Sequence, residues 1–436
     1  MKRRRFVKTV SSAALGLLAP RVPLFARGSP SEKLVVAVMG LNGRGTVLGK
    51  VFAKNPNAAV AYVCDVDSQV LAKGVAAIGE SQAPSPKPLG DFRRALDDKS
   101  IDALVIAAPD HWHAPAAILA MSAGKHVYLE KPCGHNAREG ELLVEAQRKH
   151  GRVVQMGTQQ RSAPASIEIV NAIREGLIGK PYQARAWYAN TRGTIGRGKL
   201  VPVPANLDYD LWQGPAPHTP YHDNVIHYNW HWFRRWGTGE ICNNGTHEID
   251  VCRWALGVDR CIRVTSTGGR YHFDDDWEFP DTQEAAFEFP GGKTIIWEGQ
   301  SCNGLTTYGR SRGTAILGTT GSVVMDRDGY VVYDLHEKVV KQSLATQAGD
   351  GLNVSADDDM TALHIANFVE AIRSGAQLHQ PIEEGAKSVL LCHLGNIAQW
   401  TGRALRVDAA TGRIQGDEAA MAYWQREYAP GWTPTV

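Results

Sequence analysis

Several features that mark common protein classes are missing from this chain of 436 residues. Its seven cysteines are odd in number and form no C-x-x-C spacing, so they signal neither a disulfide framework nor a zinc site. No apolar run reaches the roughly 18 to 20 residues that cross a membrane. Lysine and arginine total 47 against 45 acidic residues, so the basic excess typical of nucleic-acid binders is also absent. With 43% hydrophobic and 21% charged residues, the sequence favours an ordinary globular protein with neither a membrane span nor a nucleic-acid partner.

Residues 1–30 predict an export signal rather than part of the fold. A charged start is followed by a weakly apolar stretch that ends at Pro20. The pair Arg3 and Arg4, a spacer and then residues 6–8 resemble the twin-arginine signal of bacteria. The likeness implies a periplasmic or otherwise exported protein that the twin-arginine machinery carries already folded. The alternative is the basic N-terminus of a cytoplasmic protein.

The pattern that follows predicts a βαβ unit with a nucleotide-binding turn. The continuous apolar run 34–39 is typical of a strand buried on both faces of a parallel sheet. It leads into a glycine-rich turn, a helix-like stretch and a second strand, 59–64, which ends at Asp65. A carboxylate at Asp65 suits the ribose hydroxyls of a dinucleotide. The cofactor-binding residues predicted here are Gly40, Asn42, Gly43, Arg44, Gly45 and Asp65.

The turn departs from the usual G-x-G-x-x-G pattern at one position. Asn42 stands where the second glycine is expected. Asparagine tolerates left-handed backbone better than most residues, so the turn can keep its shape. Asp65 would repel the 2′-phosphate of NADP, and the sequence therefore favours NAD over NADP as the cofactor.

Strands and helices continue to alternate up to about residue 155. Further strands are predicted at 102–107 and 126–129, with helical stretches near 93–97, 114–123 and 138–150. This alternation predicts an α/β domain over 31–155, a doubly wound parallel sheet of the Rossmann type.

Two long motifs give the chain a resemblance to a known family. Residues 109–113, 123–127 and 130–132 read PDHWH, AGKHV and EKP, and residues 237–250 read GTGEICNNGTHEID. In this order, about 100 residues apart, they are similar to the signature blocks of the Gfo/Idh/MocA oxidoreductases, relatives of glucose–fructose oxidoreductase and inositol dehydrogenase.

The resemblance implies a second, α+β domain with an open, mostly antiparallel sheet, here over 156–436. The residues agree with it. The run 182–188 alternates with period two, and Pro290, Gly291 and Gly292 separate two short strands as a hairpin turn would. More short strands and two closing helices, near 359–374 and 384–401, follow.

The resemblance also implies roles for individual side chains. His247 would be the acid/base that takes a hydroxyl proton as hydride leaves, and Lys131 would stabilise charge on the reacting oxygen. A cis proline, Pro132, would set where Lys131 points. The signature run would also place Pro109, His113, Glu130 and Lys131 against the cofactor.

Asn243 marks a departure from the family, whose usual residue there is aspartate. An amide cannot take a proton, so a relay through this position is lost or rerouted, although Asn243 can still position a substrate hydroxyl. We therefore count Asn243 with Lys131 and His247 as the candidate catalytic residues.

The segment 222–236 is unusually rich in His, Trp, Asn and Arg. Flat aromatic faces beside polar donors suit a sugar ring, although a packed aromatic core would have the same composition. Its histidines lack a companion carboxylate at a recognised spacing, so no metal is predicted. The candidate substrate-binding residues are His227, Trp230, His231, Asn243 and His247.

Three functions remain open from the sequence. The first is an NAD-dependent oxidoreductase acting on a sugar, polyol or glycoside hydroxyl. The second is a redox-neutral NAD-dependent glycosidase that oxidises, eliminates, hydrates and reduces again. The third is a carbohydrate- or nucleotide-binding protein without turnover, which Asn243 favours and His247 opposes.

Export would require the cofactor to stay bound, because no NADH pool exists outside the cytoplasm. A homodimer or homotetramer is expected from the family.

Overall fold

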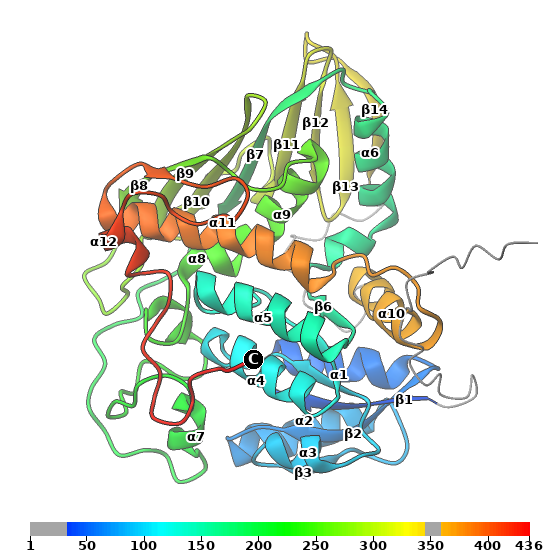
Figure 1. Cartoon of the computed structure of the whole chain (residues 1–436), viewed down its shortest axis with the longest axis vertical. Helices are drawn as coiled ribbons and strands as arrows, with labels where there is room; N and C mark the ends of the chain where they lie inside the picture. The colour runs from blue at the N-terminus through cyan, green and yellow to red at the C-terminus, as the bar shows by residue number, and fades with distance from the viewer. Residues whose placement is uncertain (1–32, 345–358) are drawn as a thin grey trace, which may run out of the picture.

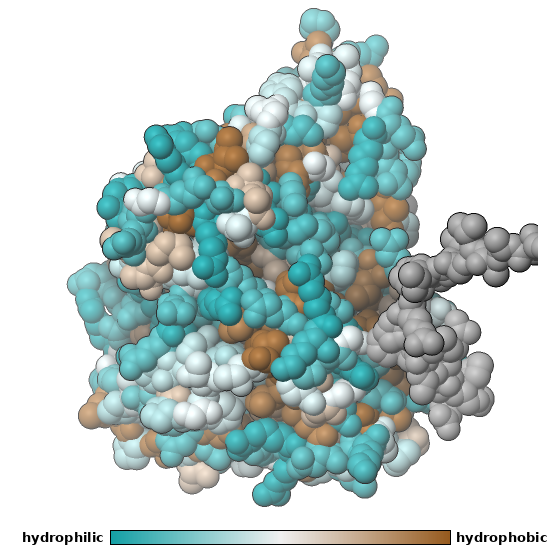
Figure 2. Space-filling model, in the orientation of Figure 1, coloured by the Kyte–Doolittle hydropathy of each residue, from teal (hydrophilic) through white to brown (hydrophobic). Residues whose placement is uncertain are grey.

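The computed structural model describes residues 33–344 and 359–436, which form an α/β unit and a second unit built on a larger sheet (Figure 1). The predicted export signal lies outside the described residues. In the described part of the chain, no helix combines the length and apolar character that a membrane crossing requires. Atoms coloured hydrophilic dominate the face shown in Figure 2, and the hydrophobic patches there are separate from one another.

The first sheet is parallel throughout and has the order β3-β2-β1-β4-β5-β6. Its strand order reverses between β1 and β4, which is where doubly wound sheets bind ligands, beyond the carboxyl ends of the strands. The predicted Rossmann sheet is confirmed, while the two short outer strands, β3 and β6, were not predicted. The strands are β1 (Leu34–Met39), β2 (Ala58–Cys64), β3 (Lys87–Leu89), β4 (Ala103–Ile106), β5 (His126–Leu129) and β6 (Val154–Met156).

Helices cover both faces of this sheet, and one of them comes from far along the chain. Ile365, Phe368 and Val369 of α10 pack into the same core cluster as Phe52 of α1, with the rings of Phe52 and Phe368 edge to face. The chain's last residues also return here, where Arg426 donates hydrogen bonds to Glu139 and to the carbonyl of His111. The helices are α1 (Arg44–Lys54), α2 (Ser68–Gly79), α3 (Arg93–Asp97), α4 (Asp110–Ser122), α5 (Ala137–His150) and α10 (Asp359–Ser374).

The second sheet has nine strands in the order β14-β13-β12-β11-β7-β10-β9-β8-β15. Every neighbouring pair is antiparallel except β7 with β10, so the expected mostly antiparallel sheet is confirmed. Gly291 and Gly292 both have positive φ in the β9–β10 turn, as the hairpin signal requires. The strands are β7 (Pro181–Ala189), β8 (Arg263–Gly269), β9 (Thr282–Phe289), β10 (Lys293–Gln300), β11 (Arg312–Gly318), β12 (Ser322–Asp326), β13 (Gly329–Tyr333), β14 (Val339–Leu344) and β15 (Leu405–Arg406).

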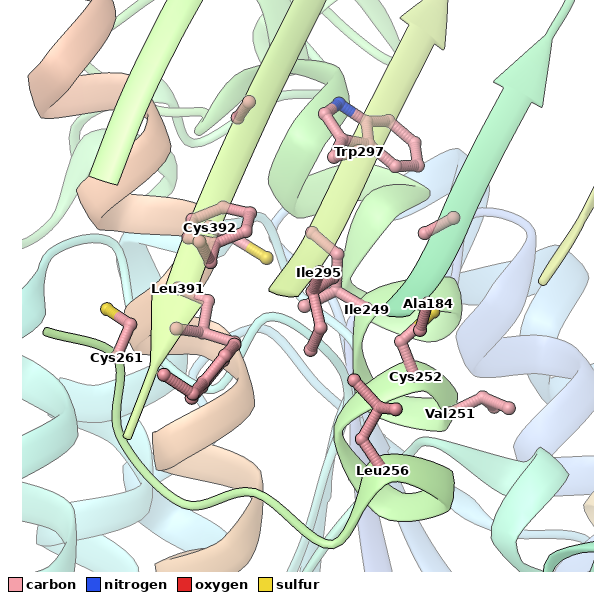
Figure 3. Packing of buried hydrophobic residues seen from close by; sticks show 14 of the residues in the cluster. Ala184, Ile249, Val251, Cys252, Leu256, Cys261, Ile295, Trp297, Leu391 and Cys392 are labelled. Atoms are coloured by element: carbon pink, nitrogen blue, oxygen red, sulfur yellow. The ribbon is translucent and has the colours of Figure 1, made fainter. Parts of the chain in front are cut away.

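Helices pack on one face of the second sheet and bury its main core (Figures 1 and 3). Ile249 and Cys252 of α9 meet Ile295 and Trp297 of β10, and Leu391 of α11 closes the cluster. This packing fixes α9, which carries His247. The remaining helices are α6 (Pro164–Arg174), α7 (Tyr209–Gln213), α8 (Gly239–Asn243), α9 (Gly245–Leu256), α11 (Ile382–Thr401) and α12 (Glu418–Met421), with 3₁₀ turns η1 (Gln159–Ser162) and η2 (Asn229–Trp232).

The long segment between β7 and α8 crosses back to the first unit. The backbone N–H of Ser68 donates to the carbonyl of Asn206 (2.9 Å), and that of Asp208 donates to the carbonyl of Val66 (3.0 Å). Part of this long segment, including Trp230 and Trp236 of the predicted aromatic segment 222–236, forms a small core of its own in which Trp212 is also buried. The segment between β7 and α8 therefore covers the turn between β2 and α2, next to Asp65.

Candidate functional site

One cavity of about 600 Å³ lies between the two units. Residues beyond the carboxyl ends of β1, β2 and β4 line one wall, and residues of β7, α8, α9 and β11 line the other. All the site residues predicted from the sequence line it except Gly45. The structure thus brings together the glycine turn, the Glu-Lys-Pro turn, the aromatic segment and His247.

The glycine turn has the geometry that close approach of a dinucleotide requires. A Cβ atom at Gly40 would lie 2.6 Å from the backbone nitrogen of Ala108, and one at Gly45 would lie 1.6 Å from the carbonyl oxygen of Gly40. Gly45 is therefore needed for packing of the helix on the strand and does not line the cavity. Gly43 precedes α1 with φ +72°, and no side chain caps this helix. Its N-terminus suits a pyrophosphate, and the exposed Asn42 leaves the turn intact.

The carboxylate of Asp65 ends β2 at the rim of the cavity. It accepts hydrogen bonds from the backbone N–H of Leu41 (2.8 Å) and of Asp67 (2.9 Å). Burial raises the pKa of Asp65. Burial would also raise the pKa of Asp67, but hydrogen bonds from Asn206, Val70 and Gln69 outweigh it and lower the pKa. These residues fit a ribose, and two acidic groups so close together oppose the additional phosphate of NADP.

His227 lies at this same end of the cavity. Its Nε2 is 3.1 Å from Oδ2 of Asp67, so a residue of the second unit contacts the corner that follows β2. The sequence grouped His227 with the substrate-binding residues. Its contact places it beside Asp65, the carboxylate predicted for the ribose.

Lys131 faces Asn243 across the boundary of the two units. Its Nζ donates to the carbonyl oxygen of Asn243 (2.7 Å) and to the amide Oδ1 of the same residue (3.2 Å). The Lys131–Pro132 peptide bond is cis, as the resemblance implied. Burial lowers the pKa of Lys131. Asn243 thus accepts hydrogen bonds from Lys131, although its amide cannot take a proton.

His247 is buried, and among the residues that the structure describes none hydrogen-bonds its ring. Burial lowers the pKa of His247 well below the ordinary value of 6.5, and the positive charges of Arg327, Lys131 and Arg312 lower it further. The imidazole is therefore neutral at neutral pH, with a lone pair for a proton. A neutral base beside a lysine can accept the proton of a bound hydroxyl.

His113 lines the cavity but is held by its surroundings. Its Nδ1 lies 2.5 Å from the carbonyl oxygen of Pro132, and its Nε2 lies 2.8 Å from that of Ala108. The ring therefore ties the Glu-Lys-Pro turn to the end of β4, where Pro109 begins the next helix. This arrangement positions Lys131 and leaves the His113 ring without a free nitrogen.

The buried Glu130 and the half-buried Arg44 of the glycine turn form an ion pair. Arg44 Nε donates to Glu130 Oε1 at 2.8 Å, and its Nη2 donates to Thr361 of α10 at 3.2 Å. Burial would raise the pKa of Glu130, but Arg44 and Lys131 outweigh it and lower the pKa. Glu130 thus holds Arg44 at the cofactor end and compensates the charge of Lys131.

Only part of the aromatic segment faces the cavity. Trp230 stacks on His231 with the ring centroids 3.6 Å apart, and both residues line the cavity. Burial, with Lys131 and Arg192 nearby, lowers the pKa of His231 to about 3. Trp232 instead stacks on Trp277 in a separate core. The sequence could not tell the cavity-lining Trp230 and His231 from Trp232, because all three lie in the same segment rich in His and Trp.

The sequence also missed a polar network on the wall formed by the second unit. Arg192 donates to Glu240 (2.9 Å) and to the hydroxyl of Tyr228 (2.8 Å). Glu240 lies inside the quoted motif 237–250, which could have signalled it. Nothing in the sequence distinguishes Arg192, Arg312 or Arg327 from the other arginines, because strands and turns far apart in sequence bring them together.

No three His, Cys, Asp or Glu side chains within residues 33–344 and 359–436 are grouped so as to hold a metal ion. All seven cysteines are free.

Comparison with known proteins agrees with this architecture. Residues 34–158 match the oxidoreductase family with an NAD-binding Rossmann fold, and residues 168–326 match its C-terminal alpha/beta domain. Solved structures with the same fold include an aldose-aldose oxidoreductase from Caulobacter crescentus (TM-score 0.65, 18% identity) and levoglucosan dehydrogenase (TM-score 0.66, 19% identity). The alignments cover 86% of this chain, and 100% and 99% of those chains.

Curated relatives are similar over shorter stretches. A glycosyl hydrolase family 109 protein of Stenotrophomonas maltophilia is 28% identical over 61% of this chain and 57% of its own length. An inositol 2-dehydrogenase of Salmonella paratyphi B is 31% identical over 30% of this chain and 38% of its own length. The chain thus spans about half the length of these relatives, or less. With both domains matched in order, the chain belongs to the Gfo/Idh/MocA family of oxidoreductases.

Proposed function

We propose that this protein is an NAD-dependent oxidoreductase that oxidises a hydroxyl group of a sugar, polyol or glycoside. The observation that carries the proposal is the neutral, buried and unpartnered ring of His247 beside Lys131, in the cavity that the glycine turn opens. Relatives named for inositol and levoglucosan support the substrate class. When bound, NAD supplies the hydride acceptor.

The chain's own residues would bind the substrate and move its proton. The ring of His247 takes the proton from the substrate hydroxyl, so that the carbon below can release its hydrogen as hydride. Lys131, held by Asn243, stabilises the negative charge that grows on the oxygen. Burial of both groups excludes water and strengthens these interactions.

Cofactor contacts divide between the two units in this proposal. The turn 40–45 and the N-terminus of α1 take the pyrophosphate, and Asp65 takes the ribose. His227, which the sequence assigned to the substrate, closes the ribose end from the second unit through Asp67. Trp230 and His231 remain on the substrate side with Asn243 and His247.

The test is reduction of NAD by purified protein with a panel of sugars, polyols and aryl glycosides. We expect the near-ultraviolet absorbance of NADH to rise with at least one compound, and no rise with the His247→Ala variant. Full activity in that variant would refute the acid/base assignment.

A second function is favoured by the glycosyl hydrolase family 109 relatives. With the same residues and bound NAD, a sugar hydroxyl could be oxidised transiently to a ketone, which acidifies a neighbouring C–H. Loss of that proton would eliminate the glycosidic leaving group. Addition of water and return of the hydride would then complete the cycle. Release of aglycone over many turnovers without net NADH would favour this glycosidase, whereas NADH without aglycone would favour the dehydrogenase.

We further propose that the protein is exported by the twin-arginine route and retains its NAD. The sequence 1–30 supports the route, and the segment that covers the β2–α2 corner supports retention. Denatured protein should release nucleotide in stoichiometric amount, and a preparation without it would contradict retention.

We expect a homodimer or homotetramer, which light scattering of the purified protein would establish.

A further inference from the structure

Glu240 of α8 is a buried carboxylate that accepts hydrogen bonds from four side chains of the second unit. Its Oε2 accepts from Nε of Arg192 (2.9 Å) and from the hydroxyl of Ser301 (3.0 Å). Its Oε1 accepts from the amide Nδ2 of Asn243 (3.3 Å) and of Asn244 (2.5 Å). Because Glu240 is only 5% exposed, these side chains satisfy its oxygens in place of water.

Glu240 fixes which way the two neighbouring amides lie. A carboxylate only accepts hydrogen bonds, so both asparagines must present their NH2 groups to it. The amide oxygens therefore point to cations on the other side. Oδ1 of Asn243 accepts from Nζ of Lys131 (3.2 Å), and Oδ1 of Asn244 accepts from Nη1 of Arg312 (3.4 Å). The two ends of an amide have nearly the same shape, so their hydrogen-bond partners decide its orientation.

The orientation of Asn243 matters because of what it holds. Its backbone carbonyl also accepts from Nζ of Lys131 (2.7 Å), so both ends of this contact lie at the end of α8. Asn243 and Lys131 line the cavity together with His247. If the amide were reversed, its NH2 group would face the ammonium, and two buried donors would oppose each other. The lysine would then move away from its place in the cavity.

We propose that Glu240 is a positioning residue for Lys131. It orients the amide of Asn243, and this amide holds the ammonium where the substrate oxygen gains negative charge. The inference rests on the proposed function, which gives Lys131 that role. It also accounts for asparagine at position 243. An aspartate there would place a carboxylate oxygen where Nδ2 now lies, 3.3 Å from Oε1 of Glu240, and the like charges would repel each other.

Pairing with Arg192 does not by itself explain the position of Glu240. Arg192 contacts Oε2 of the carboxylate, and its other nitrogens donate to the hydroxyls of Tyr228 (2.8 Å) and Tyr188 (3.2 Å). Glu240→Gln therefore tests the orientation of the amides while it keeps the shape of the side chain. Arginine has no acceptor, so the oxygen of the new amide would stay toward Arg192. Its NH2 group would face Asn243 and force that amide to turn.

Exchanging the two groups gives the sharpest test. We expect Glu240→Gln and Asn243→Asp each to lower kcat about tenfold with little change in KM, because each places two like groups against each other. The double variant should regain most of the lost kcat. In it, the new carboxylate accepts from the new amide and keeps its other oxygen on Lys131. Glu248→Gln is the matched control, since this buried carboxylate pairs with Arg312. It should not rescue Asn243→Asp.

A second measurement follows Lys131 without any substrate. Brief labelling with acetic anhydride, followed by mass spectrometry, would give the reactivity of Lys131 relative to the exposed Lys99. In Glu240→Gln, Lys131 should react several-fold faster, because an NH2 group that faces it favours the neutral amine. In the double variant it should react no faster than in the wild-type protein.

Two results would overturn the proposal. One is a Glu240→Gln variant in which kcat and the reactivity of Lys131 are both unchanged. The other is a double variant that is no more active than the weaker single variant. If the wild-type protein oxidises no compound, the proposed function fails and the labelling of Lys131 decides the positioning role. If it oxidises a sugar but the exchange has no effect, the oxidoreductase stands and the role of Glu240 is refuted.

Discussion

The two walls of the cavity differ in the sign of their charge and in how they are built. The wall of the first unit carries acidic side chains on consecutive loops of a parallel sheet, whereas the wall of the second unit carries arginines from separate strands and turns. The residues of the first wall follow one another within short motifs, whereas those of the second wall are assembled only by the folded sheet. If the first wall binds the cofactor and the second the substrate, as proposed, then substitutions on one wall should alter one ligand alone.

We expect the largest loss of turnover from a substitution of His247, the proposed base. His247→Ala should lower turnover by about a hundredfold to ten-thousandfold, because it removes the group that we propose takes the proton. Binding of NAD, measured by quenching of tryptophan fluorescence, should be unchanged. His336→Ala, an exposed histidine outside the cavity, is the matched control and should keep full turnover. Loss of NAD binding together with turnover in His247→Ala would mean that the variant had damaged the fold instead.

A smaller effect is expected from altering the acidic wall alone. Asp65→Ser should weaken NAD binding by about tenfold, because the ribose hydroxyls lose a hydrogen-bond acceptor. It should also reduce the preference for NAD over NADP, because the charge that repels the 2′-phosphate is removed. Affinities for both cofactors would be measured on wild type and variant. An unchanged preference would show that Asp65 does not contact the ribose and would shift attention to Asp67.

His227→Gln tests the contact that the second wall makes with the first. We expect release of bound NAD to become several-fold faster, because the contact between His227 and Asp67 spans the two units at the ribose end. Stopped-flow displacement of NAD by excess unlabelled cofactor analogue would measure it. His218→Gln, on the same segment but outside this cavity, serves as the control. Equal release rates in both variants would remove His227 from the cofactor site.

The smallest effect is a shift in the pH profile. In the proposed mechanism His247 acts as a base only when its ring is neutral, so activity should fall with decreasing pH as the ring becomes protonated. Its lowered pKa places this fall below the ordinary histidine range. Arg327→Gln removes a positive charge that disfavours protonation, so the pKa of His247 should rise and the acid limb should move to higher pH. A limb that stays in place or moves to lower pH would contradict the electrostatic account.

The same contrast explains what could be predicted from the sequence. The first wall is local: an apolar run, a glycine turn and Asp65 follow one another within a few tens of residues, so their pattern survives in the sequence. His247 and Lys131 were predicted through motifs, and both line the cavity. Arg312 and Arg327 could not be found, because their position depends on strand register, which pairs Arg312 with Tyr188 across β11 and β7. The contact of His227 with Asp67 was missed because the two residues lie in loops 160 positions apart, which only the fold brings together.

In the proposed reaction, a hydrogen on a substrate carbon passes to NAD in the cavity that His247 lines. The most direct test mixes sugars and polyols deuterated at every carbon with the NAD-loaded protein. The reaction is quenched in alkaline methanol, and the nicotinamide is examined by mass spectrometry. We expect deuterium on the reduced nicotinamide with the wild-type protein and none with His247→Ala. Bound NAD that stays unreduced and free of deuterium with every compound, including those that bind, would contradict it.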